Sequence, residues 1–87
     1  MDFEYDPAKS ASNLDKHGID FETAQALWGD PAMIEAPALT SDEERYLSVG
    51  RIKDRIWTAI WTPRKGQARI ISVRRARKEE IRVYEST

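Results

Sequence analysis

The sequence predicts a small α+β domain spanning residues 1–87, with two N-terminal helices, an antiparallel sheet meander and a C-terminal helix. Three observations support this fold class. Helix-capping residues and apolar residues at helical spacing occupy the N-terminal third. Three strand-like runs separated by short polar turns follow. Near the C-terminus, apolar residues again occur at helical spacing. A chain of 87 residues can bury one modest core, so we expect a single domain.

The first predicted elements are a short strand at Phe3–Tyr5 and a helix that ends near His17. Asp6 suits the N-cap and Pro7 the first helical position, where the missing N–H of proline costs nothing. Gly18 is the expected left-handed residue after the last turn. The apolar stripe of this helix is sparse and consists of Ala8, Ala11 and Leu14.

Asp20 is predicted to cap a second helix, which Gly29-Asp30-Pro31 brings to an end. The core-facing residues of this helix are expected at helical spacing, namely Phe21, Ala24, Leu27 and Trp28. A weak strand at Met33–Ala36 then leads into a polar loop at Thr40–Glu44, whose acidic run Asp42-Glu43-Glu44 we interpret as solvated.

Three closely spaced strands are predicted over residues 45–50, 55–62 and 69–74. The segments that join them have lengths that suit antiparallel hairpins. The middle strand should lie in the centre of the sheet because both of its faces are apolar, with Trp57, Ala59 and Trp61 on one face and Ile56 and Ile60 on the other. A final helix is predicted over residues 77–86, with an inner face of Ile81 and Tyr84.

Charge is distributed unevenly along the chain, although the formal net charge is only −1. Residues 1–50 carry 3 basic and 11 acidic side chains, a net charge of −8, whereas residues 51–87 carry 11 basic and 4 acidic ones, a net charge of +7. The basic side chains are densest over residues 69–78. This asymmetry favours a polyanionic partner, most often nucleic acid, while the acidic half argues against indiscriminate phosphate binding.

Composition excludes several kinds of site. The chain has no cysteine, which excludes disulfides, thiolate catalysis and Cys-ligated metal centres and fits the cytoplasm, where we expect the protein. A single histidine excludes a multi-His metal site, so we expect neither a metal nor a cofactor. No apolar run approaches the roughly 18 residues of a transmembrane helix and the acidic start is no signal peptide, so no membrane partner is expected.

Arg74 and Arg75, at the end of the last predicted strand, are the first candidates for chemistry. Successive strand residues point to opposite faces, so the pair should divide between the two faces of the sheet, with both charged groups at the surface. A guanidinium offers a planar fork of donors that matches phosphate oxygens, which would make the pair a phosphate clamp. The alternative is that both arginines pair with Glu79, Glu80 or the acidic half, and spacing alone favours this second interpretation.

Three further residues have both a structural and a functional interpretation. His17 is either a cation that suits the helix C-terminus or a general acid or base, and sequence alone favours the first. Trp57 and Tyr84 are expected in the core. An exposed Trp57 would instead offer a surface on which a base could stack, and Tyr84 would offer a phenol donor.

Several short motifs occur in order along nearly the whole chain. They are Phe3-Glu-Tyr-Asp-Pro-x-Lys9, Asn13-x-x-Lys16-His17-Gly18-Ile19-x-Phe21, Asp30-Pro31, Glu44-Arg45-x-x-x-x-Gly50 and Arg69-Ile-Ile-Ser-x-Arg74-Arg75-Ala76, with Glu80 and Tyr84 completing the set. In this order they resemble BrnT, the toxin of the bacterial BrnT/BrnA type II toxin–antitoxin systems. The resemblance implies a RelE-like ribonuclease fold, RNA cleavage that blocks translation, and neutralisation by a BrnA-like ribbon-helix-helix antitoxin in a hetero-oligomer.

The leading hypothesis is a metal-independent endoribonuclease, in which the 2′-hydroxyl of the RNA attacks the adjacent phosphate. Charge on the phosphate would be stabilised by Arg74 and Arg75, with Arg64 as a further candidate. Proton transfer would fall to His17, Lys16 or Tyr84. Candidates for RNA binding are Arg64, Arg69, Arg77 and Trp57. Two alternatives stay open: a nucleic-acid-binding module without catalysis, and a protein-interaction domain whose acidic half docks a basic partner.

Overall fold

Helices and strands occur in separate runs along most of the chain, as expected of the α+β class. The structure, a computed structural model, describes residues 1–39 and 43–87. Of the predicted loop at Thr40–Glu44, positions 40–42 lie outside the described residues. No helix of the described part is long and apolar enough to cross a membrane. The elements are β1 (Phe3–Glu4), α1 (Pro7–His17), α2 (Phe21–Ala24), the 3-10 helix η1 (Gln25–Gly29), β2 (Ile34–Pro37), β3 (Tyr46–Ile52), β4 (Arg55–Arg64), β5 (Gln67–Arg75) and α3 (Lys78–Glu85).

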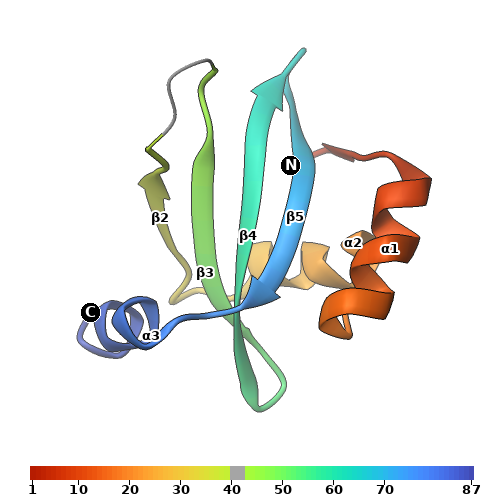
Figure 1. The fold of residues 1–87 in the computed structure, drawn as a ribbon. Coiled ribbons are helices and arrows are strands. Elements are labelled where there is room, and N and C mark those ends of the chain that lie inside the picture. Colours follow the sequence, from red (N-terminus) through yellow and green to blue (C-terminus); the bar gives the residue numbers. More distant parts are fainter. Residues whose placement is uncertain (40–42) are drawn as a thin grey trace.

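The strands form one five-stranded mixed sheet in the order β1-β5-β4-β3-β2 (Figure 1). The pairs β2–β3, β3–β4 and β4–β5 are antiparallel, and β4 is central as its two apolar faces predict. β1 instead lies parallel to β5, with Glu4 opposite Arg69. The predicted purely antiparallel sheet is therefore wrong at this edge, because a local strand pattern does not specify which distant edge the strand joins.

The hairpin between β4 and β5 is tighter than predicted, because both strands extend further than their apolar runs. Its turn consists of Lys65 and Gly66 alone, and both have positive φ values, 51° and 77°, as a two-residue type I′ turn requires. β5 also contains a bulge: Ser72 pairs with Ile60 and Ile70 with Trp61, so the residue between them, Ile71, has no counterpart in β4.

The predicted boundaries of α1 are confirmed, but its predicted apolar stripe is not the side that packs. The Asp6 side chain accepts a hydrogen bond from the backbone N–H of Ala8, and Gly18 ends the helix with a φ of 82°. The buried residues are Ser10 and Asn13, whereas Leu14 is 48% exposed. α1 therefore docks through polar atoms, which a hydrophobic periodicity does not reveal.

The second predicted helix divides into α2 and η1. Asp20 caps it as predicted, accepting from the backbone N–H of Thr23 at 2.8 Å. After one turn of α-helix the chain tightens into the 3-10 helix, and Phe21, Ala24 and Leu27 are still buried along one side. The following strand, β2, begins one residue later than predicted.

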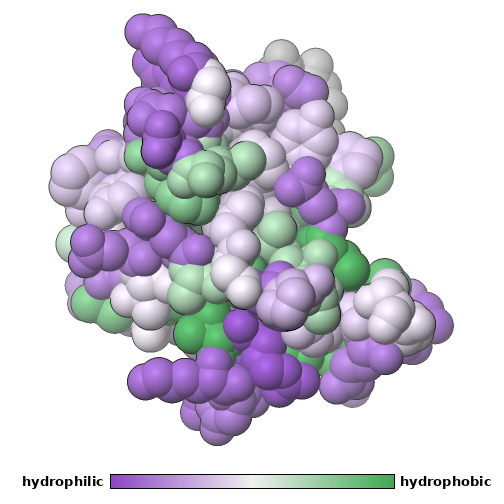
Figure 2. Space-filling view, turned by 180° about the vertical axis from the view of Figure 1, so that it is seen from behind, coloured by the Kyte–Doolittle hydropathy of each residue, from purple (hydrophilic) through white to green (hydrophobic). Residues whose placement is uncertain are grey.

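Apolar side chains pack on both faces of the sheet. On the rear face, α2 and η1 cover a cluster that includes Trp57 and Val73 (Figure 1). On the front face, α3 crosses one end of the sheet, where Tyr84 packs with Val49 and Ile56. Seen from the rear, hydrophilic side chains gather at the two ends of the molecule and hydrophobic ones lie between them (Figure 2). The prediction that Trp57 and Tyr84 belong to the core is confirmed, and Trp61 is buried as well.

The side-chain amide of Asn13 joins α1 to the outer edge of β5. Its Nδ2 donates to the carbonyl oxygen of Val73 at 2.9 Å and to that of Ile19 at 2.7 Å, and its Oδ1 accepts from the backbone N–H of Val73 at 3.1 Å. β1 pairs with β5 only as far as Arg69. Asn13 therefore takes the place of a strand further along the same edge, where the backbone groups of Val73 would otherwise lack a partner.

We predict that Asn13→Leu lowers the free energy of unfolding by about 2–5 kcal/mol, because it leaves buried backbone groups of Val73 and Ile19 without hydrogen bonds. Urea denaturation followed by circular dichroism measures the change. Ser12→Ala, on the exposed side of the same helix, is the control and should stay within about 0.5 kcal/mol of the parent. A parent-like midpoint for Asn13→Leu would contradict the proposed role of the amide.

Candidate nucleic-acid interface

Two adjoining hollows lie between α1 and the strands β4 and β5, and they share the side chains of Lys9 and Ile71. The larger one, the arginine hollow, has a volume of about 500 Å³ and the smaller, the histidine hollow, one of about 290 Å³. The bulge in β5 contributes to both, since Ile71 is its extra residue and Ser72 follows it. The two hollows are therefore neighbours along the β5 edge.

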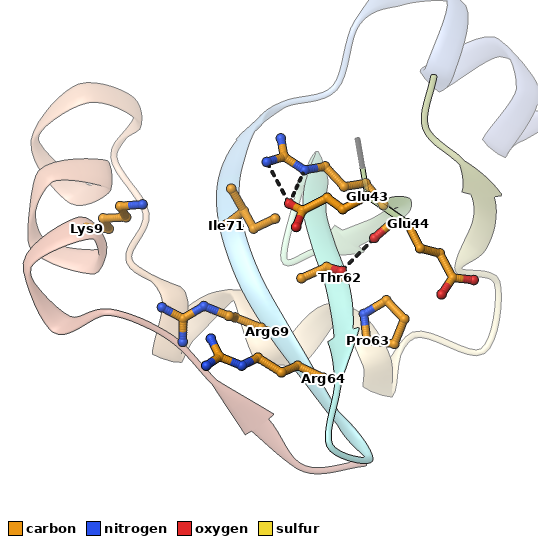
Figure 3. A pocket seen from close by; sticks show the side chains of 9 residues that line it. Lys9, Glu43, Glu44, Thr62, Pro63, Arg64, Arg69 and Ile71 are labelled. Atoms are coloured by element: carbon orange, nitrogen blue, oxygen red, sulfur yellow. Dashed lines mark hydrogen bonds and ion pairs between the residues drawn. The ribbon is translucent and has the colours of Figure 1, made fainter. Parts of the chain in front are cut away.

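The arginine hollow brings together cations from three elements. Lys9 comes from α1, Arg64 from the end of β4 and Arg69 from the start of β5 (Figure 3). Figure 3 shows the guanidinium groups of Arg64 and Arg69 beside each other, with Lys9 reaching in from the far side. The remaining lining residues are Glu43, Glu44, Arg45, Thr62, Pro63 and Ile71. Two of the predicted RNA-binding residues therefore share one surface.

The histidine hollow lies beside the C-terminal half of α1. Lys9, Lys16 and His17 line it together with Ser72 of β5. Lys9 and Lys16 are seven residues apart, which places them on the same side of a helix two turns from each other. Since Asn13 lies between them and holds the helix to β5, the same hydrogen bonds that dock α1 also position these cations. Ser12, Asn13, Phe21 and Ile71 complete the lining.

Arg74 and Arg75 divide between the two faces as predicted, but each has a contact within the fold. The Arg75 guanidinium lies 5.6 Å from the centroid of the Trp57 ring. Arg74 donates from Nη1 and Nη2 to the two carboxylate oxygens of Glu80, at 2.8 and 2.9 Å. With its side chain 19% exposed, Arg74 is not the free surface group that its strand-end position predicts. The alternative interpretation, pairing with Glu80, therefore describes Arg74.

Glu80 is the acceptor on which the start of α3 depends. Besides Arg74 it accepts from the hydroxyl of Thr58 at 2.9 Å and from the backbone N–H of Arg77 at 2.8 Å. The hydrogen bonds from the Arg74 guanidinium are the main reason that the pKa of Glu80 falls from 4.5 to about 2. The same contact raises the pKa of Arg74. This network fastens α3 to β4 and β5.

Tyr84 makes the second polar attachment of α3. Its hydroxyl donates to Oδ2 of Asp30 at 2.6 Å, and the same oxygen accepts from the backbone N–H of Arg51 at 2.8 Å. This hydrogen bond lowers the pKa of Asp30 and raises that of Tyr84. Gly50 permits the close approach, because a Cβ there would lie 3.1 Å from a methyl group of Leu27 and 3.3 Å from Oδ2 of Asp30. The hydroxyl of Tyr84 is therefore used in a hydrogen bond within the fold.

The predicted site residues therefore separate into three places. Lys16, His17, Arg64 and Arg69 lie along the two hollows. Arg74 and Tyr84 hold α3, and the exposed Arg77 is the N-cap residue that precedes α3. Trp57 is only 7% exposed and lies beneath Arg75, so its ring is not open for stacking a base.

Sequence reasoning did not single out Lys9, Asn13 or Ser72 as site residues. The available signal was the spacing of Lys9, Asn13 and Lys16 at intervals of four and three residues, which indicates one side of a helix. Ser72 gave no local signal, because its position depends on the bulge. Among the described residues, no three His, Cys, Asp or Glu side chains gather in a way that could hold a metal ion.

The chain matches one known protein family over most of its length. The family model described as "Ribonuclease toxin, BrnT, of type II toxin-antitoxin system" matches residues 5–80, which is most of the chain. The matched segment includes α1, the central strands and the beginning of α3. Among curated proteins there is no significant match.

We predict that Glu80→Gln destabilises the protein at neutral pH and that the difference from the parent shrinks as the pH falls from 4.5 toward 2. Folding lowers the pKa of Glu80, so its contribution to stability is present above 4.5 and is lost as the carboxylate takes up a proton. Thermal melts of both proteins across this range provide the test. Glu85→Gln, near the exposed end of α3, should show no such pH-dependent difference. A Glu80→Gln effect of equal size at every pH would contradict the ionised pair.

Proposed function

The chain belongs to the BrnT family of ribonuclease toxins of type II toxin–antitoxin systems, and from this premise we propose that it cleaves RNA in the histidine hollow. The observation that carries the proposal is the position of the chain's one histidine. His17 shares a hollow with Lys9 and Lys16, and the adjoining hollow, which Lys9 also lines, contains three arginines. An acid–base group thus lies at one end of a surface suited to a phosphate backbone.

The proposed reaction uses the RNA's own 2′-hydroxyl as the nucleophile. The 2′-oxygen loses its proton and forms a bond to the adjacent phosphorus, while the bond from phosphorus to the 5′-oxygen of the next nucleotide breaks. The products are a 2′,3′-cyclic phosphate and a 5′-hydroxyl end. The step requires a proton acceptor, a proton donor and positive charge beside the phosphate oxygens. It requires no nucleophile from the protein.

Within this proposal His17 accepts the proton of the 2′-hydroxyl, since an imidazole is the side chain best suited to proton transfer near neutral pH. Lys16 gives a proton to the departing 5′-oxygen. Lys9 and the hydroxyl of Ser72 stabilise the charge that develops on the phosphate oxygens. Arg64 and Arg69 bind the backbone further along the strand. Arg74 and Tyr84 act indirectly, by holding α3 in place.

Membership of a type II family implies an antitoxin partner. We propose more specifically that this partner is a BrnA-like ribbon-helix-helix protein, that it forms a hetero-oligomer with the toxin in the cytoplasm, and that free toxin inhibits translation by cleaving RNA. We also propose that the arrangement of helices around the meander is of the RelE-like kind. These details rest on the family resemblance of the motifs described above.

We predict that the purified protein cleaves RNA in the presence of EDTA, because the proposed step uses no metal ion. Gel electrophoresis and mass spectrometry should detect products that carry a cyclic phosphate and a 5′-hydroxyl. RNA methylated at every 2′-oxygen should bind without being cut. RNA that is shifted on a native gel but stays intact would instead favour the nucleic-acid-binding module without catalysis.

We predict that His17→Asn reduces the cleavage rate by about 10²–10⁴-fold, the usual loss when a general acid or base is removed, with no change in folding. The parent's pH–rate profile should contain an inflection that is absent in the variant. Asp15→Asn, which alters an exposed residue of the same helical turn outside both hollows, serves as the control. Full activity in His17→Asn would return this residue to the role of a helix-terminal cation.

A further inference from the structure

Glu43 and Glu44 line the arginine hollow, and a third acidic side chain, Glu4, contacts two of its arginines. Oε1 of Glu4, on the edge strand β1, accepts a hydrogen bond from Nη1 of Arg69 at 3.2 Å and lies 3.5 Å from Nε of Arg64. A single carboxylate oxygen is therefore the shared partner of two guanidinium groups. The parallel pairing of β1 with β5 places it there, because it sets Glu4 directly opposite Arg69.

These two contacts differ from the structural Arg–Glu pair of the same protein. Arg74 and Glu80 make two parallel hydrogen bonds of 2.8 and 2.9 Å between side chains that are less than a fifth exposed. The Glu4 contacts lie at or beyond the long end of the hydrogen-bonding range. The side chain of Arg64 is 53% exposed, and those of Glu4 and Arg69 are each 31% exposed. Ion pairs that solvent can reach contribute little to stability. The geometry at Glu4 is thus that of a loosely held counter-ion.

We propose that Arg64 and Arg69 form a subsite for one backbone phosphate of RNA, and that Glu4 occupies this subsite as a displaceable counter-ion in the free protein. This inference rests on the proposed function, since it assumes an RNA ligand. A phosphodiester has two non-bridging oxygens, one for each guanidinium, whereas Glu4 uses a single oxygen for both. A further cation of the hollow, Lys9, also lines the histidine hollow.

The consequence of the counter-ion is weaker binding to phosphate backbones in general. RNA that enters the subsite must replace Glu4, so part of the attraction between phosphate and arginine is offset. Removal of the Glu4 charge should therefore tighten RNA binding, although Glu4 itself makes no favourable contact with RNA. A residue with a purely structural role would produce the opposite result or none.

The test is the affinity of fluorescently labelled, fully 2′-O-methylated RNA, measured by anisotropy at several salt concentrations. Glu4→Gln should tighten binding by up to about fivefold, the factor that corresponds to ~1 kcal/mol for an exposed ion pair. Glu79→Gln is the matched control, because it removes the same charge from another Arg–Glu pair, on α3. Equal affinities for the two variants, or weaker binding by Glu4→Gln, would overturn the proposal.

A second pair of variants keeps the test decisive if Glu4→Gln fails to fold. Arg64→Gln should weaken binding and make it less sensitive to salt, since one phosphate contact is lost. Lys65→Gln, the adjacent residue in the hairpin turn, should bind like the parent. Equal effects of the two substitutions, or no measurable RNA binding by any variant, would contradict the subsite.

Parallel cleavage assays separate this inference from the proposed function. If unmethylated RNA is bound but never cut, the ribonuclease proposal fails while the comparison of Glu4→Gln with Glu79→Gln still reports on the subsite. If RNA is cut but the two variants bind alike, the phosphate subsite alone fails.

Discussion

The contact on which the site depends is the pairing of the Asn13 amide with the backbone of Val73. Beyond Arg69 the outer edge of β5 has no strand partner among the described residues, and buried backbone groups at such an edge must still be satisfied. Asn13 forms hydrogen bonds with both the N–H and the carbonyl oxygen of Val73, and these bonds require α1 to lie along β5. Because Lys9, Lys16 and His17 belong to that helix, the requirement for hydrogen bonds at a sheet edge also determines where the cations lie.

The arginines that are candidates for phosphate binding differ in the contacts that they make within the fold. Arg74 and Arg75 belong to the densest basic run of the chain, yet both make contacts within the fold. Arg74 donates hydrogen bonds to Glu80, and the guanidinium of Arg75 lies over the ring of Trp57. Arg64 and Arg69 are different, because they lie at the far end of the hairpin, where the loosely held Glu4 contacts both of them. Burial and partner geometry, rather than the number of neighbouring charges, therefore identify the candidate phosphate contacts.

Local signals in the sequence predicted much of this fold. The caps at Asp6, Asp20 and Gly18 depend on residues within a few positions, and the central place of β4 follows from its own two apolar faces. The features that build the site connect distant residues, namely Asn13 with Val73 and Glu4 with Arg69. Such pairings depend on register and on the β5 bulge, which periodicity does not encode. The sequence motifs nevertheless included several of these residues before their contacts were known.

The most direct test of the account is to map RNA onto the surface by nuclear magnetic resonance. Uniformly labelled protein would be titrated with 2′-O-methylated RNA, which the proposed reaction cannot cut. The account predicts that resonances of Lys9, Lys16, His17, Arg69 and Ser72 shift together, while those at the exposed side of α3, such as Arg82 and Val83, stay unchanged. Shifts confined to α3 and β2, with α1 unaffected, would contradict the claim that α1 and the edge of β5 form the RNA-binding site.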